Sequence, residues 1–169
     1  MRRLTRTAAG AASACALVAL AGLGASSGSA AAGYGKAGNQ SGSVARAPSA
    51  AKIAVGKSSL GAILVSGRGR SVYLFEKDHR KASTCYAACA SEWPPVVTSR
   101  VPVATKGVLA TMLGTRKRRN GTLQVTYDGH PLYNYAGDAK AGQTNGQGSN
   151  AFGGAWYVLS PAGRKIDND

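Results

Sequence analysis

An internal repeat limits the fold of this chain more than any other feature of its sequence. Residues 53–78 align without a gap to residues 113–138, at an offset of 60 positions. The identical pairs are Lys57 and Lys117, Gly61 and Gly121, Val65 and Val125, Gly69 and Gly129, Tyr73 and Tyr133, and Asp78 and Asp138. A repeat of this length indicates two copies of one supersecondary unit that share a core. The sequence therefore predicts two units related by approximate two-fold symmetry.

Alternating apolar residues within the repeat predict β-strands. Ile63 and Val65 share one face of a strand in the first copy, and Leu123, Val125 and Tyr127 share one face in the second. We expect each copy to be a three-strand meander, with strands over residues 53–57, 62–66 and 71–75 and then over 113–117, 122–127 and 131–135. The dipeptide Asn120-Gly121 is typical of a hairpin turn in the second copy.

A segment that begins with tryptophan is expected to close each copy, over residues 93–97 and 156–159. Pro94 and Pro95 cannot donate ladder hydrogen bonds, so the first closing segment is expected at a sheet edge or in a loop. The predicted fold class is a mainly β, small antiparallel domain of two pseudo-symmetric meander repeats, with at most a short helix near the cysteine pair. The domain is expected over residues 52–166, with repeats over about 53–97 and 113–159.

The N-terminal part of the chain has the features of an export signal followed by a linker. Arg2, Arg3 and Arg6 precede an apolar run, and small residues at 28–30 are typical of a signal-peptidase site. Cys15 lies inside the run without the Leu and small residues of a lipoprotein signal, so membrane anchoring is not expected unless Cys15 is lipidated. We expect a signal peptide over 1–30, a disordered linker over 31–51, and a secreted or cell-envelope protein; the Sec and twin-arginine routes both stay open.

The chain is strongly basic, which favours anionic partners. It carries 21 basic and 7 acidic residues, for a net charge of +14, and cleavage would remove three arginines to leave +11. The densest basic run, expected to contact an anionic cell-wall polymer or an envelope protein, is Arg116, Lys117, Arg118 and Arg119. A charged, protective edge strand is the alternative interpretation. Nucleic acid is not an expected partner, because no recognition helix or aromatic RNA-binding motif accompanies the run.

The sequence resembles a bacterial family of secreted and lipoprotein repeats that a Tyr-x4-Asp motif defines. The motif stands at residues 73–78 and 133–138. The resemblance extends to Ser83-Thr84-Cys85, Cys89, Trp93-Pro94-Pro95, residues 129–133 and residues 144–148, and so covers nearly the whole predicted domain. It implies an uncharacterised activity, with only a family-level association with hydrocarbon catabolism. The chain departs from lipoprotein members because it lacks a clear acylation site.

Two interpretations of the Tyr-x4-Asp motif are open. In each copy two aromatic rings share one strand face and an aspartate follows the strand end; these residues are Tyr73, Phe75 and Asp78, then Tyr133, Tyr135 and Asp138. In the structural interpretation the carboxylate accepts turn N–H groups beside a buried ring, with Tyr–Asp hydrogen bonding as a further element. In the site interpretation the rings form a platform and the carboxylates bind a metal ion or a sugar.

Cys85 and Cys89 are the only cysteines that remain after export, so they are expected to form a disulfide bond. The spacing differs from the Cys-x-x-Cys of thiol oxidoreductases, and a zinc site would need further Cys or His ligands. A small metal-binding or thiol-redox protein that uses the two cysteines with nearby His79 and Asp78 is the alternative. His130 is expected at a turn, where a solvent-facing polar residue suffices.

No catalytic residue, metal site or cofactor is predicted. The chain contains no Gly-x-Ser-x-Gly elbow, no phosphate-binding loop and no dinucleotide fingerprint. The predicted function is an exported, non-enzymatic envelope or extracellular module that contacts an anionic polymer or a protein. An enzyme that uses Asp78 and Asp138 is a further hypothesis, which requires both carboxylates to meet in a cleft.

Overall fold

The computed structural model describes residues 49–80 and 82–167. The expected signal peptide and almost all of the expected linker lie outside the described residues. The first half contains β1 (Lys52–Ser58), β2 (Gly61–Ser66), β3 (Tyr73–Phe75), the 3-10 helix η1 (Glu76–Asp78), α1 (Ala88–Glu92) and β4 (Val97–Thr98). A connection with β5 (Val103–Ala104) and the 3-10 helix η2 (Ala110–Met112) follows. The second half contains β6 (Leu113–Lys117), β7 (Leu123–Tyr127), β8 (His130–Pro131), β9 (Asn150–Ala151) and β10 (Gly154–Val158).

The predicted fold class is confirmed. The described chain is mainly β, its pairs are antiparallel except for the short β1–β5 pair, and α1 is a short helix that contains Cys89. The hairpins β1–β2 and β6–β7 occupy corresponding places in the two repeats. Asn120 and Gly121 form the turn of the second hairpin, where Gly121 has a φ of 85° and Asn120 Oδ1 accepts the Thr122 N–H. The left-handed φ explains why glycine follows asparagine there.

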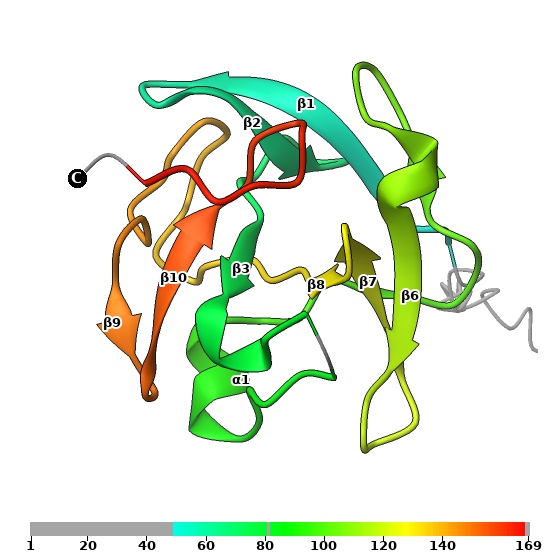
Figure 1. Cartoon of the computed structure of the whole chain (residues 1–169), viewed down its shortest axis with the longest axis vertical. Helices are drawn as coiled ribbons and strands as arrows, with labels where there is room; N and C mark the ends of the chain where they lie inside the picture. The colour runs from blue at the N-terminus through cyan, green and yellow to red at the C-terminus, as the bar shows by residue number, and fades with distance from the viewer. Residues whose placement is uncertain (1–48, 81, 168–169) are drawn as a thin grey trace, which may run out of the picture. The chain divides into compact units, whose positions relative to one another are not determined.

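The two repeats exchange their closing segments. β10 of the second repeat pairs with β3 of the first, and Figure 1 shows the two strands side by side. In the other direction, β4 of the first repeat pairs with β7 of the second. The Pro94 carbonyl accepts the Asn134 N–H and Pro95 bridges to Tyr133, so the prolines contribute acceptors only, as expected. Neither repeat therefore completes its sheet from its own residues.

An approximate two-fold axis passes between the two motif tyrosines. The Tyr73 N–H donates to the Tyr133 carbonyl at 2.8 Å, and the Tyr133 N–H donates to the Tyr73 carbonyl at 3.0 Å. This reciprocal pair is the antiparallel bridge that joins the repeats at their centre. The tyrosines thus occupy corresponding environments, as the two-fold prediction requires.

The ungapped alignment is shifted by one residue between β2 and β7, the second strands of the two repeats. The Val72 N–H donates to the Leu64 carbonyl, whereas the corresponding Leu132 N–H donates to the Val125 carbonyl. Leu64 is therefore the counterpart of Val125, although the alignment pairs Val65 with Val125. The cause is one extra residue in the β2–β3 connection, where a turn brings the Arg70 carbonyl to the Ser66 N–H.

The central strands are buried on both faces, which differs from the one-sided strands that the alternation predicts. All three residues of β3 are buried, and neighbours along the strand belong to different core clusters. Tyr73 and Phe75 pack in the cluster that contains both tryptophans, while Leu74 packs in the other cluster with Val125. Packing on both faces explains why strand residues 72–75 read as a continuous apolar run.

Candidate functional site

The two Tyr-x4-Asp motifs meet inside the domain, and each is completed by the other repeat. The Tyr73 hydroxyl donates to Asp138 Oδ2 at 2.6 Å, and the Tyr133 hydroxyl donates to Asp78 Oδ2 at 2.5 Å. All four side chains are buried. The pairs thus tie the repeats together, whereas the sequence was interpreted as a turn closed within each copy.

Each carboxylate uses its other oxygen to hold the loop that follows its own motif. Asp78 Oδ1 accepts the Thr84 N–H and the Thr84 hydroxyl, both at 2.7 Å. Asp138 Oδ1 accepts the Asn145 N–H at 2.9 Å. These are the loop N–H bonds that the structural interpretation of the motif predicts. One aspartate therefore binds its own loop and the opposite tyrosine at the same time.

Four aromatic rings form a column beside these pairs. Phe75 stacks on Trp156 and Trp156 stacks on Trp93, both with ring centres 4.0 Å apart, and Trp93 contacts Tyr135 at 4.3 Å. The rings come alternately from the first, second, first and second repeat, so the column has the same two-fold symmetry as the fold. Phe75 and both tryptophans are buried, which leaves Tyr135 as the one partly exposed ring of this column. Of the motif rings that were expected to form a platform, Tyr73, Phe75 and Tyr133 are buried and Tyr135 is partly exposed.

Burial sets the protonation chemistry of the pairs. It raises the pKa of Tyr73 and Tyr133 well above the ordinary value of 10.0, and the charge and hydrogen bonds of the partner carboxylates raise both further. Burial also raises the pKa of the Asp78 carboxyl, although hydrogen bonds from Tyr133 and Thr84 lower it. Both phenols are therefore neutral donors near pH 7. The arrangement holds protons in place and offers neither phenolate as a base.

The predicted Cys85–Cys89 disulfide is present, with Cα atoms 5.3 Å apart. Both cysteines are buried in the tryptophan cluster. The bond links the loop that Asp78 holds to α1, and the Cys89 carbonyl accepts the Trp93 N–H at the end of that helix. Within residues 49–80 and 82–167, no three His, Cys, Asp or Glu side chains gather as they would around a metal ion.

The expected basic patch needs one correction, because Arg118 is buried at 5 % exposure. Its guanidinium donates to Ser83 Oγ, Gln124 Oε1 and the Cys85 carbonyl, all within 2.7 Å. Arg118 follows β6 and turns inward against the disulfide loop, where these neutral acceptors bind Nη1 and Nη2, while Nε is buried without an acceptor in the described part of the chain. The exposed members of the run are Arg116, Lys117 and Arg119.

A hollow of about 630 Å³ gathers three other cations, which the sequence analysis did not single out. Lys52, Arg68 and Arg70 line it together with residues 94–97 and Asn134, and no acidic side chain among residues 49–80 and 82–167 contributes to it. The sequence did contain a signal: Lys52 begins one strand of the first hairpin, and Arg68 and Arg70 follow the other. Because β1 and β2 are antiparallel, the start of one lies beside the end of the other.

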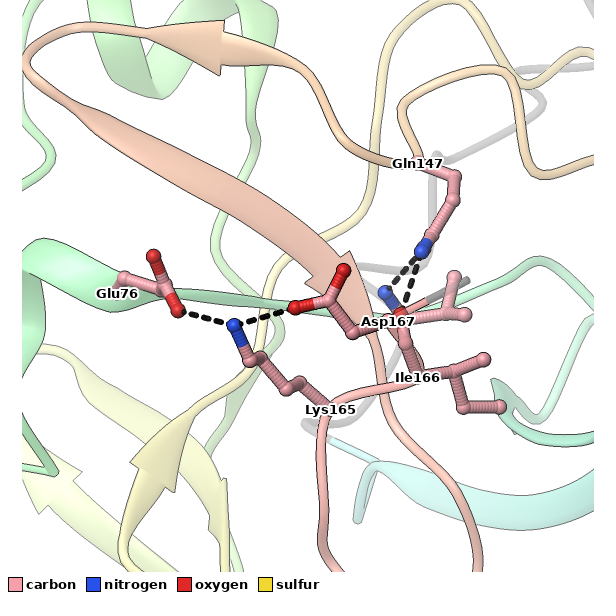
Figure 2. A network of polar contacts seen from close by, with 6 residues as sticks. Glu76, Gln147, Lys165, Ile166 and Asp167 are labelled. Carbon is pink, nitrogen blue, oxygen red and sulfur yellow. Dashed lines mark hydrogen bonds and ion pairs between the residues drawn. The ribbon is translucent and has the colours of Figure 1, made fainter. Parts of the chain in front are cut away.

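A second hollow, of about 560 Å³, is lined by both histidines, Leu74 and several charged residues. Two of its three cations, Arg80 and Lys165, form ion pairs. Figure 2 shows Lys165 between two carboxylates, with Nζ 2.9 Å from Glu76 and 2.7 Å from Asp167. Arg80 pairs with Asp128 at 3.0 Å and its Nε donates to His130 Nε2 at 2.8 Å. Burial and the charge of Arg80 lower the pKa of His130.

Together these features define a class of protein: a small, disulfide-bonded β domain made of two intertwined repeats. A family model described as a secreted repeat of unknown function matches the chain twice, over residues 54–97 and 114–160. The two matches cover more than half of the chain, so the chain belongs to this family of secreted repeats of unknown function. Comparisons with curated proteins and with solved structures found no significant match. In the described part of the chain, no helix is both long and apolar enough to span a membrane.

Proposed function

We propose that this chain is a non-enzymatic module that binds an anionic polymer of the cell envelope, outside the cytoplasm. Two findings support an extracytoplasmic role: the family is described as secreted, and the domain contains a disulfide bond. Disulfide bonds persist in oxidising compartments and are rare in the cytosol. The export signal expected over residues 1–30 agrees with this placement.

The observation that carries the proposal is a surface on which cations outnumber their acidic partners. Asp78 and Asp138 are buried and serve the motif tyrosines. Within residues 49–80 and 82–167, Arg80 and Lys165 are the only cations that form ion pairs. The exposed cations without an ion pair in this part of the chain are Lys52, Lys57, Arg68, Lys77, Arg100, Lys106, Arg116, Lys117, Arg119, Lys140 and Arg164.

A polyanion supplies the charge that this surface lacks. Many weak contacts between surface cations and a charged polymer release counterions, so affinity arises without a deep active site. The same physics makes the affinity fall steeply as salt rises. A buried catalytic centre is not required, and the neutral tyrosines and buried carboxylates of the motif serve the fold.

Co-sedimentation with purified cell walls tests this function. The purified chain should sediment with walls at low salt and be released when the salt concentration is raised several-fold. Walls stripped of their anionic polymers are the control and should retain much less protein. Equal retention on intact and stripped walls, or retention that salt does not change, would contradict the proposal.

A further inference from the structure

We infer that the hollow lined by Lys52, Arg68 and Arg70 is the site that holds an anionic group of the polymer, a phosphate or a carboxylate. This inference rests on the proposed function and assigns it to one place on the surface. It differs from the expectation drawn from the sequence, which placed the anionic contact on the run that begins at Arg116.

The hairpin geometry brings the three cations together. Ile53 is opposite Ser66 in the β1–β2 register, so Lys52 lies beside the chain that leaves β2. A Cβ added at Gly67 would lie 3.0 Å from the Lys52 Cβ, which shows how closely the two segments approach. Gly69 then adopts a φ of 77°, which favours glycine, and turns the chain so that the Arg70 carbonyl reaches the Ser66 N–H. The turn thus places Lys52, Arg68 and Arg70 around one hollow.

Arg70 has hydrogen-bonding capacity that the described chain does not use. Its Nη2 donates to the Tyr135 carbonyl at 3.1 Å, which fixes the guanidinium against the second repeat. Its Nε is buried and has no acceptor in the described part of the chain. Buried donors without an acceptor are uncommon in native proteins. The described part of the chain has two others, Trp93 Nε1 and Arg118 Nε, but of the three residues only Arg70 lines the hollow. A planar guanidinium held in this way suits the paired oxygens of a phosphate or a carboxylate.

The second hollow provides an internal comparison. At the repeat offset, Arg70 corresponds to His130 and Asn134 corresponds to Leu74. Arg70 and Asn134 line the first hollow, and their counterparts line the second. In the His130 hollow, Arg80 and Lys165 form ion pairs, of which Figure 2 shows those of Lys165, while Arg164 forms none in the described part of the chain. Among the described residues, no acidic side chain lines the Arg70 hollow, and none of its three cations forms an ion pair. The Arg70 hollow therefore has more unneutralised positive charge for a ligand than the His130 hollow, where only Arg164 lacks an ion pair.

The size of the Arg70 hollow fits a unit of a polymer better than a lone ion. Its volume of about 630 Å³ lies within the usual range of ligand sites. Residues 94–97 add prolines and valines to the wall, so the carbon skeleton of a repeating unit has an apolar surface to contact. The cations would hold the acidic group while this wall contacts the rest of the unit.

Binding of two defined polymers to paired charge variants tests the site. The probes are purified poly(glycerol phosphate) and polygalacturonate, measured by calorimetry with the full chain at one low salt concentration. The double variants Arg68→Gln with Arg70→Gln and Lys52→Gln with Arg68→Gln each remove two charges from the hollow; the second keeps the Arg70–Tyr135 bond. The matched control, Arg116→Gln with Lys117→Gln, removes two charges from exposed β6. Thermal melting checks that each variant folds.

Both hollow variants should weaken binding by about tenfold or more, because charge-assisted hydrogen bonds are lost, while the control should change it by about threefold or less. The probe that shows the larger loss identifies phosphate or carboxylate as the acidic group. Equal losses in the hollow variants and the control would overturn the assignment to the hollow and leave the proposed function standing. Absence of binding by the unaltered chain to both probes and to cell walls would overturn the proposed function itself.

Discussion

The two repeats use different loops to reach the same arrangement. Between its aspartate and its tryptophan, the first repeat has the disulfide and α1, whereas the second has a glycine- and asparagine-rich loop without a cysteine. Both loops donate an N–H to their own aspartate. Both also contact the tyrosine of the other repeat that their own aspartate binds: Ser83 Oγ accepts from Tyr133, and the Gly146 N–H donates to Tyr73.

This difference shows which features the fold requires. The tyrosine, the aspartate and the tryptophan recur in both halves, because they form the bonds that cross between repeats and the central ring stack. The loops need only supply an N–H at the right place and leave room for the rings. In the first repeat the Cys85–Cys89 disulfide holds the loop in this arrangement. In the second, Gly146 does so by close approach, since an added Cβ there would lie 2.5 Å from the Trp93 ring.

Removal of the motif carboxylates should have the largest effect. Asp78→Ala leaves two Thr84 donors without their acceptor, while the Tyr133 hydroxyl keeps Ser83 Oγ as a second acceptor. Asp138→Ala leaves the Tyr73 hydroxyl and the Asn145 N–H without their acceptor. At about 1–3 kcal/mol for an unsatisfied buried group, we expect losses of about 3 kcal/mol at each position. Urea unfolding of the two variants measures both losses.

Asparagine substitutions sharpen the same comparison. Both oxygens of each aspartate accept hydrogen bonds, so Asn replaces one acceptor with a donor. At Asp78 the Tyr133 proton can turn to Ser83 Oγ, 2.7 Å away, and the cost should be about 1 kcal/mol. At Asp138 the other neighbour of the Tyr73 hydroxyl is the Gly146 N–H, itself a donor, so Asn should cost about 2 kcal/mol. Equal costs would show that Ser83 gives no relief.

A double-mutant cycle checks that the pairs cross between repeats. Tyr73→Phe combined with Asp138→Ala should show a coupling energy of about 1–2 kcal/mol, because the two side chains share one hydrogen bond. Tyr73→Phe combined with Asp78→Ala should be nearly additive. A larger coupling within the repeat than across it would contradict the exchanged arrangement.

The loops themselves should show the next largest effect. The double substitution Cys85→Ala with Cys89→Ala removes a short covalent ring, and we expect a loss of about 2 kcal/mol from loop entropy. Gly146→Ala should cost about 1–3 kcal/mol through overpacking against Trp93. Gly148→Ala is the matched control in the same loop, because its added Cβ meets no neighbour and only the positive φ of 69° opposes it. Chemical denaturation compares all three, and similar costs at Gly146 and Gly148 would rule out the packing explanation.

The sequence predicts the local features of this molecule better than the contacts between residues that lie far apart in the chain. Strands and the Asn120-Gly121 turn follow from neighbouring residues, and the disulfide follows from having only two thiols after export. The exchange between repeats cannot be predicted from the motif spacing. Tyr73 lies near Asp78 in the sequence, but in the fold it binds Asp138. The burial of Arg118 is hidden in the same way, because it depends on Ser83 and Cys85, more than 30 residues away.

Alkaline pH should weaken both tyrosine pairs together. Burial raises the folded-state pKa of Tyr73 and Tyr133 above 10.0, so the unfolded chain loses these protons first. Their stabilising contribution is complete below pH 10 and declines as the pH rises from there toward the folded-state values. Each tyrosine should reduce the free energy of unfolding by about 1.4 kcal/mol per pH unit in that range. Denaturation at several alkaline pH values measures how the free energy of unfolding depends on pH. Tyr73→Phe and Tyr133→Phe should each remove about half of the pH dependence that the two tyrosines cause. An unchanged pH dependence in these variants would argue against buried, protonated tyrosines.

The smallest predicted effect lies on the acid side and distinguishes the two hollows. Burial and the charge of Arg80 lower the pKa of His130, while the charge of Asp128 raises it. The other charged residues that line this hollow are Glu76, Arg164 and Lys165. The folded state therefore favours neutral His130, and its contribution is present above about pH 6.5 and is lost as the pH falls through the lower folded-state pKa. Its counterpart in the other hollow is Arg70, and among the described residues histidines line only the His130 hollow. The raised pKa of Asp78 acts in the opposite direction at lower pH, so the informative quantity is the difference between the parent chain and His130→Gln. That difference should shift by less than about 1 kcal/mol between pH 7.5 and 5, because the hollow is open to solvent and screened. A shift of the opposite sign would mean that Asp128 dominates over Arg80 at His130.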